Sequence, residues 1–138
     1  MKRTAKAHWS GNLKEGKGRL TTQSGVLDGT NYSYKTRFEE DRSGTNPEEL
    51  LAAAHAGCFT MAVDSLLTKK GLNPTFLDTE ATVTMEAGVI TGIHLSITGS
   101  IAGIGADDFE AVKKDAEKNC PISKALGIPI TSEAHLIV

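Results

Sequence analysis

The segment TNPEELLAAAHAGCFTMAVDSLLTKKG, which starts at Thr45, constrains the fold most because it carries the signals for both ends of one long helix. Asn46 suits the N-cap and Pro47 suits the first helical position. Glutamates fill the first turn, lysines fill the last turn, and Gly71 suits the position just past the helix end. The sequence therefore predicts a helix that begins at Pro47 and ends at about Lys70.

This helix is apolar on almost every face, which indicates a central helix packed on several sides. Small residues between Ala52 and Gly57 would let the backbone of another element approach closely. The apolar run from Leu50 to Val63 is 14 residues long and is interrupted by His55 and Thr60. Because a membrane span needs about 20 apolar residues, we expect no transmembrane segment.

The remaining segments predict short strands and two further helices. Alternating apolar and polar residues indicate strands, and the pair Ala87-Gly88 indicates a hairpin turn. We expect strands at Thr4–Trp9, Arg19–Gln23, Tyr32–Phe38, Thr75–Glu86, Ile90–Ile101 and Ile128–Val138. We expect helices from about Asp107 to Lys118 and from Ile122 to Leu126. With 138 residues and no repeat or linker, the chain predicts one α+β domain over residues 1–138, with mostly antiparallel strands.

The charge balance excludes some partners. Fifteen basic and 17 acidic side chains leave a net charge of −2, which offers no electrostatic footprint for nucleic acid or for an anionic membrane. The basic amino terminus has no apolar core after it, so it does not resemble a secretory signal, and we expect a cytoplasmic protein. In a reducing compartment two cysteines are more often a redox pair or two core thiols than a permanent disulfide.

The two cysteines differ in local context. Cys58 lies in the middle of the long helix, where burial would raise its pKa and make it an unreactive core thiol. It becomes a nucleophile only if a nearby cation or hydrogen-bond donor holds the thiolate. Cys120 precedes Pro121 and lies at the N-cap of a short helix, where free backbone amides favour a thiolate. The cysteines are 62 positions apart, and this spacing neither supports nor excludes a disulfide.

The four histidines are scattered and match no metal-binding pattern, so we expect neither a metal nor a cofactor. His55 lies one turn before Cys58 on the same helix and could serve as a base. We interpret it instead as a histidine whose hydrogen bonds are satisfied at a helix interface.

The segment GTNPEELLAAAHAGCF, Gly44–Phe59, resembles the OsmC/Ohr family, the osmotically inducible and organic hydroperoxide resistance proteins. Further motifs match in the family's order and spacing: AHWSG at Ala7–Gly11, TRF at Thr36–Phe38 and CPIS at Cys120–Ser123. The resemblance covers essentially the whole chain, and the TRF and AAAHAGC motifs look more like the OsmC branch than the Ohr branch.

The resemblance implies an OsmC-like α+β fold with mostly antiparallel sheets around a long central helix, in an intertwined homodimer. It also implies an enzyme, a peroxiredoxin-like cysteine peroxidase. Cys58 aligns with the family's peroxidatic cysteine and Cys120 with the resolving cysteine. Arg37 aligns with the arginine that holds the thiolate, and Glu48 with the glutamate that positions this arginine. From local context alone, Arg37 would be a solvated strand-end charge and Glu48 a partner of the helix dipole.

The mechanism implied is attack of the Cys58 thiolate on an organic hydroperoxide, which gives an alcohol and a sulfenic acid. Cys120 then condenses with the sulfenic acid to a disulfide. A dithiol reductant reopens this bond, and the family's usual partner is a protein-bound lipoyl group. Candidate walls of an apolar substrate pocket, each equally interpretable as core, are Phe38, Phe59, Met61 and Phe109.

The predicted long helix separates Glu48 from Cys58. Ten residues separate Glu48 from Cys58, which is about 15 Å along a helix axis. If both residues serve one site, two central helices packed antiparallel about a twofold axis would bring Glu48 of one chain near Cys58 of the other. We therefore expect composite sites at a dimer interface.

Two other interpretations stay open. The chain could be a non-catalytic hydroperoxide sensor or binding protein that forms the same disulfide. It could also be a structural member of the family with buried, unreactive cysteines, which slow alkylation of both thiols would reveal.

Overall fold

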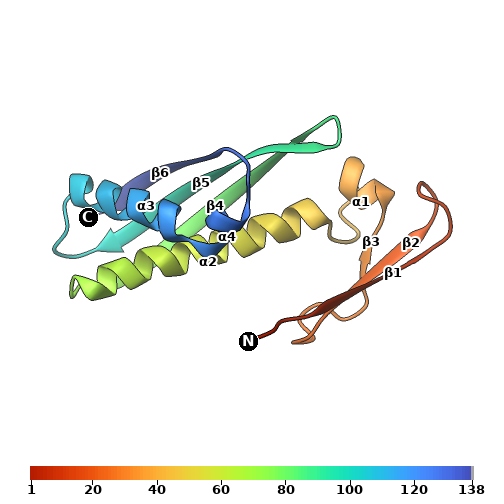
Figure 1. Cartoon of the computed structure of the whole chain (residues 1–138), viewed down its shortest axis with the longest axis horizontal. Helices are drawn as coiled ribbons and strands as arrows, with labels where there is room; N and C mark the ends of the chain where they lie inside the picture. Colours follow the sequence, from red (N-terminus) through yellow and green to blue (C-terminus); the bar gives the residue numbers. More distant parts are fainter. Residues whose placement is uncertain (138) are drawn as a thin grey trace. The chain divides into compact units, whose positions relative to one another are not determined.

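The computed structural model describes residues 1–137, and the chain divides into two compact units, Met1–Leu50 and Leu51–Val138. The first unit contains β1 (Ala5–Ser10), β2 (Lys17–Thr22), β3 (Thr30–Tyr32) and α1 (Tyr34–Phe38), and α2 (Pro47–Lys69) begins at its end (Figure 1). The second unit continues with β4 (Pro74–Glu86), β5 (Val89–Ile101), α3 (Ala106–Asn119), α4 (Pro121–Ala125) and β6 (Ile130–Ile137). The single domain over residues 1–138 stays a prediction, and the predicted end of the last strand, Val138, lies outside the described residues.

The first unit is built on an antiparallel sheet in the order β1-β2-β3. Trp9 of β1 pairs with Gly18 of β2, which pairs in turn with Tyr32 of β3. The Trp9 and Tyr32 rings meet edge to face, with centroids 5.6 Å apart. A Cβ atom at Gly18 would clash with the Tyr32 ring. Only glycine therefore lets this ring lie across the middle strand.

The predicted strand from Tyr32 to Phe38 is wrong, because the strand ends at Tyr32 and the helix α1 follows. Ser33 is the N-cap of α1, and its hydroxyl accepts the N–H of Thr36 at 3.2 Å. The Thr36 hydroxyl accepts the N–H of Ser33 at 2.8 Å, which completes a capping box. This reciprocal pair starts a helix in a segment whose aromatic and β-branched residues favour a strand.

Both predicted ends of α2 are confirmed to within a residue. The Asn46 side chain accepts the N–H of Glu49 at 2.7 Å and so caps the start of the helix. Gly71 has φ +74° just past its end, and the N–H of Leu72 bonds the C=O of Leu67 at 3.0 Å. This is the glycine-terminated ending that the sequence predicts.

The sheet of the second unit has the order β4-β5-β6. Strands β4 and β5 form the predicted antiparallel hairpin, and its turn places Ala87 at φ 50° and Gly88 at φ 77°. Strand β6 pairs with β5 in parallel. Across the described residues the strand pairs are mostly antiparallel, as predicted.

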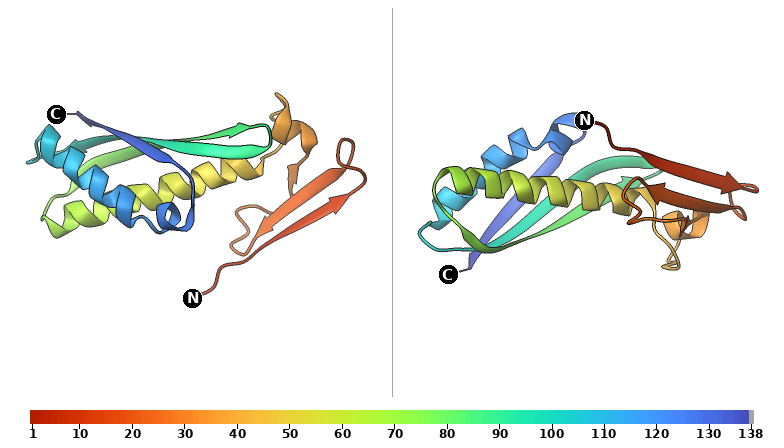
Figure 2. Two further views of the ribbon diagram at one scale, coloured as in Figure 1. Left: turned by 45° about the horizontal axis from the view of Figure 1, so that its top comes forward. Right: turned by 90° about the horizontal axis from the view of Figure 1, so that it is seen from below.

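Helices α2 and α3 cover one face of this sheet (Figure 2). Alternate residues of β5 are buried because successive side chains of a strand point to opposite faces. The buried residues on β5 are Ile93, Leu95, Ile97 and Ile101, and α3 contributes Phe109, Val112 and Ala116, as predicted. Helix α2 contributes a stripe with a spacing of four, His55, Phe59, Val63 and Leu67.

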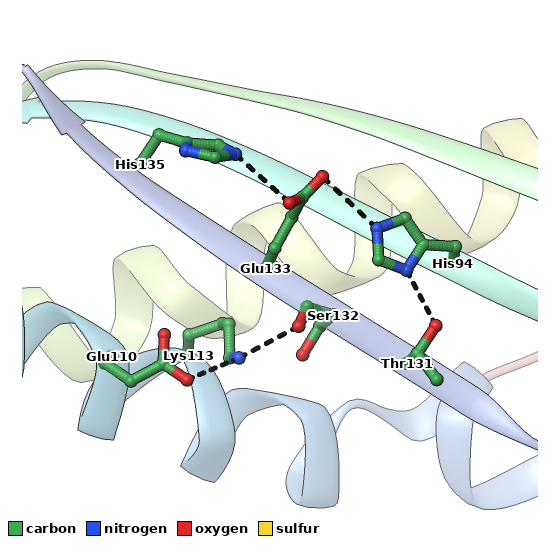
Figure 3. A network of polar contacts seen from close by, with 7 residues as sticks. All are labelled: His94, Glu110, Lys113, Thr131, Ser132, Glu133 and His135. Carbon is green, nitrogen blue, oxygen red and sulfur yellow. Dashed lines mark hydrogen bonds and ion pairs between the residues drawn. The ribbon is translucent and has the colours of Figure 1, made fainter.

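Polar side chains join β5, β6 and α3 (Figure 3). On the exposed face, the imidazoles of His94 and His135 lie 3.3 and 3.5 Å from the two carboxylate oxygens of Glu133. On the side of α3, the buried Lys113 ammonium donates to Glu110 at 2.7 Å and to the C=O of Ser132 at 3.1 Å. These contacts hold the parallel edge strand β6 between a neighbouring strand and a helix.

Within residues 1–137, α2 is the one helix long and apolar enough to cross a membrane by length and composition alone. A core helix has the same properties, and the buried stripe of α2 packs against the sheet. Only this stripe is fully buried, so the predicted packing on several sides is not reached within one chain. The exposed face carries Ala53, Ala54, Gly57 and Met61, of which Met61 is 76% exposed.

Candidate active site

The second unit brings the two cysteines together as free thiols. Cys58 lies in the middle of α2, and Cys120 lies at the junction of α3 and α4, where Pro121 begins the next helix. The Sγ atoms are 3.0 Å apart, Cys120 is fully buried, and Cys58 is partly exposed. The pair is positioned so that a short approach of the sulfurs would form a disulfide.

The pKa of the Cys58 thiol is raised. Burial is the main cause, and the hydrogen bond with Cys120 adds to it, while the backbone of Ile122 opposes both. The direction agrees with the expectation for a thiol in mid-helix. Within its own unit, over residues 51–137, no cation contributes to holding a Cys58 thiolate.

The pKa of Cys120 moves the other way. Burial opposes ionisation of this thiol, but hydrogen bonds from Cys58, from the backbone and hydroxyl of Ser123, and from the backbone of Ile122 together outweigh it and lower the pKa. This confirms that Cys120 is the more easily ionised cysteine. In this unit a negative charge is therefore more stable on Cys120 than on Cys58.

The His55 side chain hydrogen-bonds to Ser123 of α4 and not to Cys58. Its Nε2 lies 2.7 Å from the Ser123 hydroxyl. The ring is fully buried, and its Nδ1 has no hydrogen-bond partner among residues 1–137. Burial lowers the pKa of His55, against the attraction of Glu117 on α3. The expectation of a satisfied interface histidine therefore holds for one ring nitrogen only.

The first unit brings Arg37 and Glu48 together. Nε and Nη2 of Arg37 lie 2.9 and 2.8 Å from the same carboxylate oxygen, Oε1 of Glu48. The other oxygen, Oε2, is buried without a partner among residues 1–137. The Thr36 hydroxyl donates to the C=O of Thr45 at 2.8 Å, and the Asn46 amide donates to the C=O of Thr36 at 3.1 Å. These bonds fix α1 to the start of α2, so the guanidinium is oriented and keeps N–H groups for an anion.

Arg37 also lines a hollow of about 280 Å³ in the first unit. Its other walls are mostly aromatic, and the full set is Trp9, Leu13, Tyr32, Ser33, Tyr34, Arg37 and Phe38. Of the candidate walls named from the sequence, Phe38 lines this hollow, Phe59 and Phe109 are core residues, and Met61 is exposed. An apolar hollow beside one cation suits a ligand with an apolar body and one polar end.

Two features of the site were not predicted from the sequence, the position of Ser123 and the aromatic hollow. Ser123 lies in the CPIS motif, and its position three residues after the N-cap Cys120 could have indicated a hydroxyl close to that sulfur. The aromatic hollow had no sequence signal, because its residues come from β1, β3, a turn and α1.

Comparisons with known proteins show the family of the chain. A family model described as OsmC-like protein matches residues 39–133. The chain is 44% identical to the protein named Peroxiredoxin OsmC of Escherichia coli (strain K12) over 134 residues, which cover 94% of this chain and 93% of that protein. It is 31% identical to Organic hydroperoxide resistance protein OhrA of Bacillus subtilis (strain 168) over 96 residues, or 64% of each chain.

Among solved structures, an organic hydroperoxide resistance protein OsmC from Legionella pneumophila superposes with a TM-score of 0.70 at 23% identity, covering 100% of this chain and 98% of that one. This likeness supports the fold. Sequence, family model and fold agree, and the chain belongs to the OsmC/Ohr family, on its OsmC-like branch.

Proposed function

We propose that this protein is a thiol-dependent peroxidase that reduces organic hydroperoxides to alcohols. A peroxidase-type role follows from the family, whose Escherichia coli member is named a peroxiredoxin. The observation that carries the finer proposal is the 3.0 Å approach of the Cys58 and Cys120 sulfurs. Two free thiols at this separation support a cycle in which one is oxidised and the other resolves it.

The cycle has three steps. The Cys58 thiolate attacks the terminal oxygen of the hydroperoxide, the O–O bond breaks, and the alkoxide takes up a proton and leaves as the alcohol. Cys120 attacks the resulting sulfenic acid, the S–S bond forms, and water leaves. A dithiol then supplies two electrons and two protons through a mixed disulfide, and a lipoylated protein is the candidate donor.

Arg37 and Glu48 would supply what Cys58 lacks in its own unit. Burial and Cys120 raise the pKa of Cys58, so a thiolate there needs a cation. The Glu48 carboxylate holds Arg37 by two contacts at one oxygen. We propose that this oriented guanidinium holds the Cys58 thiolate, and that the aromatic hollow beside Arg37 takes the organic part of the hydroperoxide.

We propose further that the site is shared between two chains of a homodimer. Glu48 and Cys58 lie ten residues apart on α2, about 15 Å along its axis, so one straight helix does not bring them together. The exposed small residues of α2 support close packing against a second α2 in the opposite direction. In this arrangement residues 1–138 act as a single OsmC-like domain, and the reduced thiols fit a cytoplasmic protein.

The first test counts free thiols and measures intact mass after one equivalent of cumene hydroperoxide, with hydrogen peroxide in parallel. The proposal expects rapid loss of both thiols with the organic peroxide. The Cys58→Ser variant should keep its remaining thiol, and the Cys120→Ser variant should stop at a sulfenic acid. Two intact thiols in the native protein would contradict the proposal and indicate a structural role for the cysteines.

A second test uses mixed dimers of Cys58→Ser and Glu48→Ala chains. A shared site leaves one complete centre in each mixed dimer, so activity should return on mixing. No recovery would place each site within one chain. Turnover in excess dithiol separates an enzyme from a sensor, because a sensor would react once per chain and stop.

A further inference from the structure

A second hollow of the first unit, here called the basic hollow, is lined by charged and polar side chains. Its volume is about 460 Å³. Four cations and two carboxylates lie in its wall: Lys14, Lys17, Arg19, Lys35, Glu15 and Asp41. The cycle proposed above gives none of these residues a role.

The basic hollow and the aromatic hollow lie on opposite faces of the sheet β1-β2-β3. Successive side chains of a strand point to opposite faces, so Tyr32 of β3 lines the aromatic hollow while its neighbour Asn31 lines the basic one. Helix α1 shows the same division, because Arg37 lines the aromatic hollow and Lys35 lines the basic one. Ser33 lines both, so the two hollows meet at the start of α1.

The cations of the basic hollow are not neutralised within the chain. None of the four forms an ion pair among residues 1–137. The Arg19 guanidinium donates to the side-chain oxygen of Asn31 at 3.4 Å, and the Asp41 carboxylate accepts the N–H of Ser43 at 2.8 Å. Like charges around one hollow repel one another, and an anionic partner relieves this repulsion.

The basic hollow also lies in the basic unit of an acidic chain. Residues 1–50 carry nine basic and seven acidic side chains, a net charge of +2. Residues 51–138 carry six basic and ten acidic side chains, a net charge of −4. The first unit therefore attracts an acidic partner and the second repels it, so that the charges orient the partner as it approaches.

An acidic protein surface fits the basic hollow better than a small ligand does. Sites for small ligands are mostly apolar and bury most of the ligand, whereas the four cations here are all exposed. Exposed charges act mainly by attracting a partner over a distance. Of the reactants in the proposed cycle, a neutral hydroperoxide makes no use of this charge. The dithiol reductant is the reactant left to recognise it.

We propose that the basic hollow is the docking surface for the dithiol reductant, and that this reductant is a protein with an acidic surface around its dithiol. The inference rests on the proposed function, because the reductant acts on the disulfide that the proposed cycle forms. Since the two hollows meet at Ser33, a protein docked there lies beside the place proposed for the hydroperoxide and not in it.

The step that docking serves is a thiol–disulfide exchange. A thiolate of the donor attacks one sulfur of the Cys58–Cys120 disulfide, the S–S bond breaks, and a mixed disulfide forms. The second donor thiol then attacks the donor's sulfur in the mixed disulfide. The donor gives up two electrons and two protons and becomes a disulfide, and both cysteines of this protein return to thiols.

The test compares three dithiols on the oxidised protein. One equivalent of cumene hydroperoxide forms the disulfide, and the rate at which free thiols return is then measured. The donors are a peptide with a dihydrolipoyl-lysine flanked by aspartates, the same peptide with asparagines, and dithiothreitol. At low salt the acidic peptide should react about tenfold faster than the neutral one. At about 0.3 M salt this advantage should largely disappear, because salt screens exposed charges.

Charge reversal tests the residues of the surface. Lys14→Glu combined with Lys17→Glu should slow the acidic peptide about tenfold or more at low salt. The rates with the neutral peptide and with dithiothreitol should stay native, which also shows that the fold is intact. The matched control combines Lys70→Glu with Lys114→Glu, two exposed lysines of the second unit. It changes the net charge equally and should slow the acidic peptide by about twofold at most.

Equal rates for the acidic and the neutral peptide at low salt would overturn the proposal. An equal loss of rate in the two double variants would also overturn it, because the net charge and not the basic hollow would then set the rate. Absence of a disulfide after cumene hydroperoxide would instead contradict the proposed function. The disulfide can then be formed with diamide, and the comparison of the two peptides still tests the docking surface.

Discussion

At the scale of single residues, the two cysteines show how neighbouring groups shift the pKa of a buried thiol in opposite directions. Burial raises the pKa of either thiol, yet hydrogen bonding around Cys120 lowers the pKa of Cys120, while the pKa of Cys58 stays raised. A peroxidatic role for Cys58 therefore depends on a charge from outside its own unit. Under the proposed function, this charge is the Arg37 guanidinium, which Glu48 holds in the first unit.

The first prediction tests the proposed role of the Arg37 guanidinium. Under the proposed function, Arg37→Lys keeps the positive charge but loses the planar donors that contact Glu48 and hold a thiolate at once. The rate of sulfenic acid formation at neutral pH should fall by about tenfold or more, as expected when a charge-assisted hydrogen bond is lost. Single-turnover mixing with cumene hydroperoxide measures this rate.

Arg42→Lys is the matched control, since Arg42 is an exposed arginine of the same unit. It should react at the native rate. Equal rates for Arg37→Lys and the native protein would mean that Arg37 supplies only general charge, and a large loss in Arg42→Lys would assign the role to Arg42.

Glu133 gives a prediction on pH. Hydrogen bonds from His94 and Ser96, and the charge of His135, lower the pKa of its carboxyl below the ordinary value of 4.5. A carboxyl with a lowered folded pKa stabilises the fold above its unfolded pKa, and the benefit disappears as the pH falls through the folded pKa. Glu133→Gln should therefore lower the Tm at pH 7, by roughly a degree or two because the group is exposed.

Thermal unfolding at several pH values measures the effect. The difference between the native protein and Glu133→Gln should shrink as the pH falls through the folded pKa of Glu133. Glu80→Gln, a change of an exposed glutamate on β4, should show little difference at any pH. A gap of constant size from pH 7 to pH 3 would mean that the ionised carboxylate does not stabilise the β5–β6 pair.

At the scale of elements, the β4–β5 hairpin carries a local strain. Its turn places Ala87 at φ 50°, a left-handed conformation that costs a residue with a Cβ atom about 1 kcal/mol and that asparagine tolerates better. Ala87→Asn should therefore raise the free energy of unfolding by up to about 1 kcal/mol, and Ala87→Val should lower it. Urea unfolding of the three proteins measures the order, and a Val variant as stable as the Asn variant would contradict the argument.

The elements also show what the sequence could predict. The ends of α2 were predictable because Asn46 and Gly71 act on their immediate neighbours. The hairpin and α3 were predictable because their apolar periodicity coincides with their burial. Helix α1 was missed because Ser33 and Thr36 form a reciprocal pair inside a segment of strand-forming residues.

The candidate site was predictable only in part. The position of each cysteine in its helix was enough to predict that Cys120 ionises more easily than Cys58. The roles of Arg37 and Glu48 were predicted only from the family resemblance. The contact of Cys58 with Cys120 crosses 62 positions, and that of His55 with Ser123 crosses 68. No local pattern encodes such distances, since they depend on how α2, α3 and α4 pack together.

At the scale of the whole molecule, the exposed face of α2 bears on whether the active protein is a monomer or a dimer. Gly57 lies on this face, and a Cβ atom there would meet nothing within 4 Å. Within one chain Gly57→Leu is therefore permitted, and it replaces a poor helix former with a good one. If two α2 helices pack through their small residues, the same leucine would hold the backbones apart.

We therefore expect Gly57→Leu to keep its fold and to lose the proposed homodimer. Circular dichroism should show native helix content, and sedimentation velocity should show a shift from dimer to monomer with a matching loss of peroxidase activity. Gly127→Leu is the matched control, because a Cβ atom at Gly127 also meets nothing within 4 Å and the residue lies outside α2. A dimeric and active Gly57→Leu protein would mean that α2 does not form the interface. The Arg37–Glu48 pair would then have to reach Cys58 by another face of the molecule.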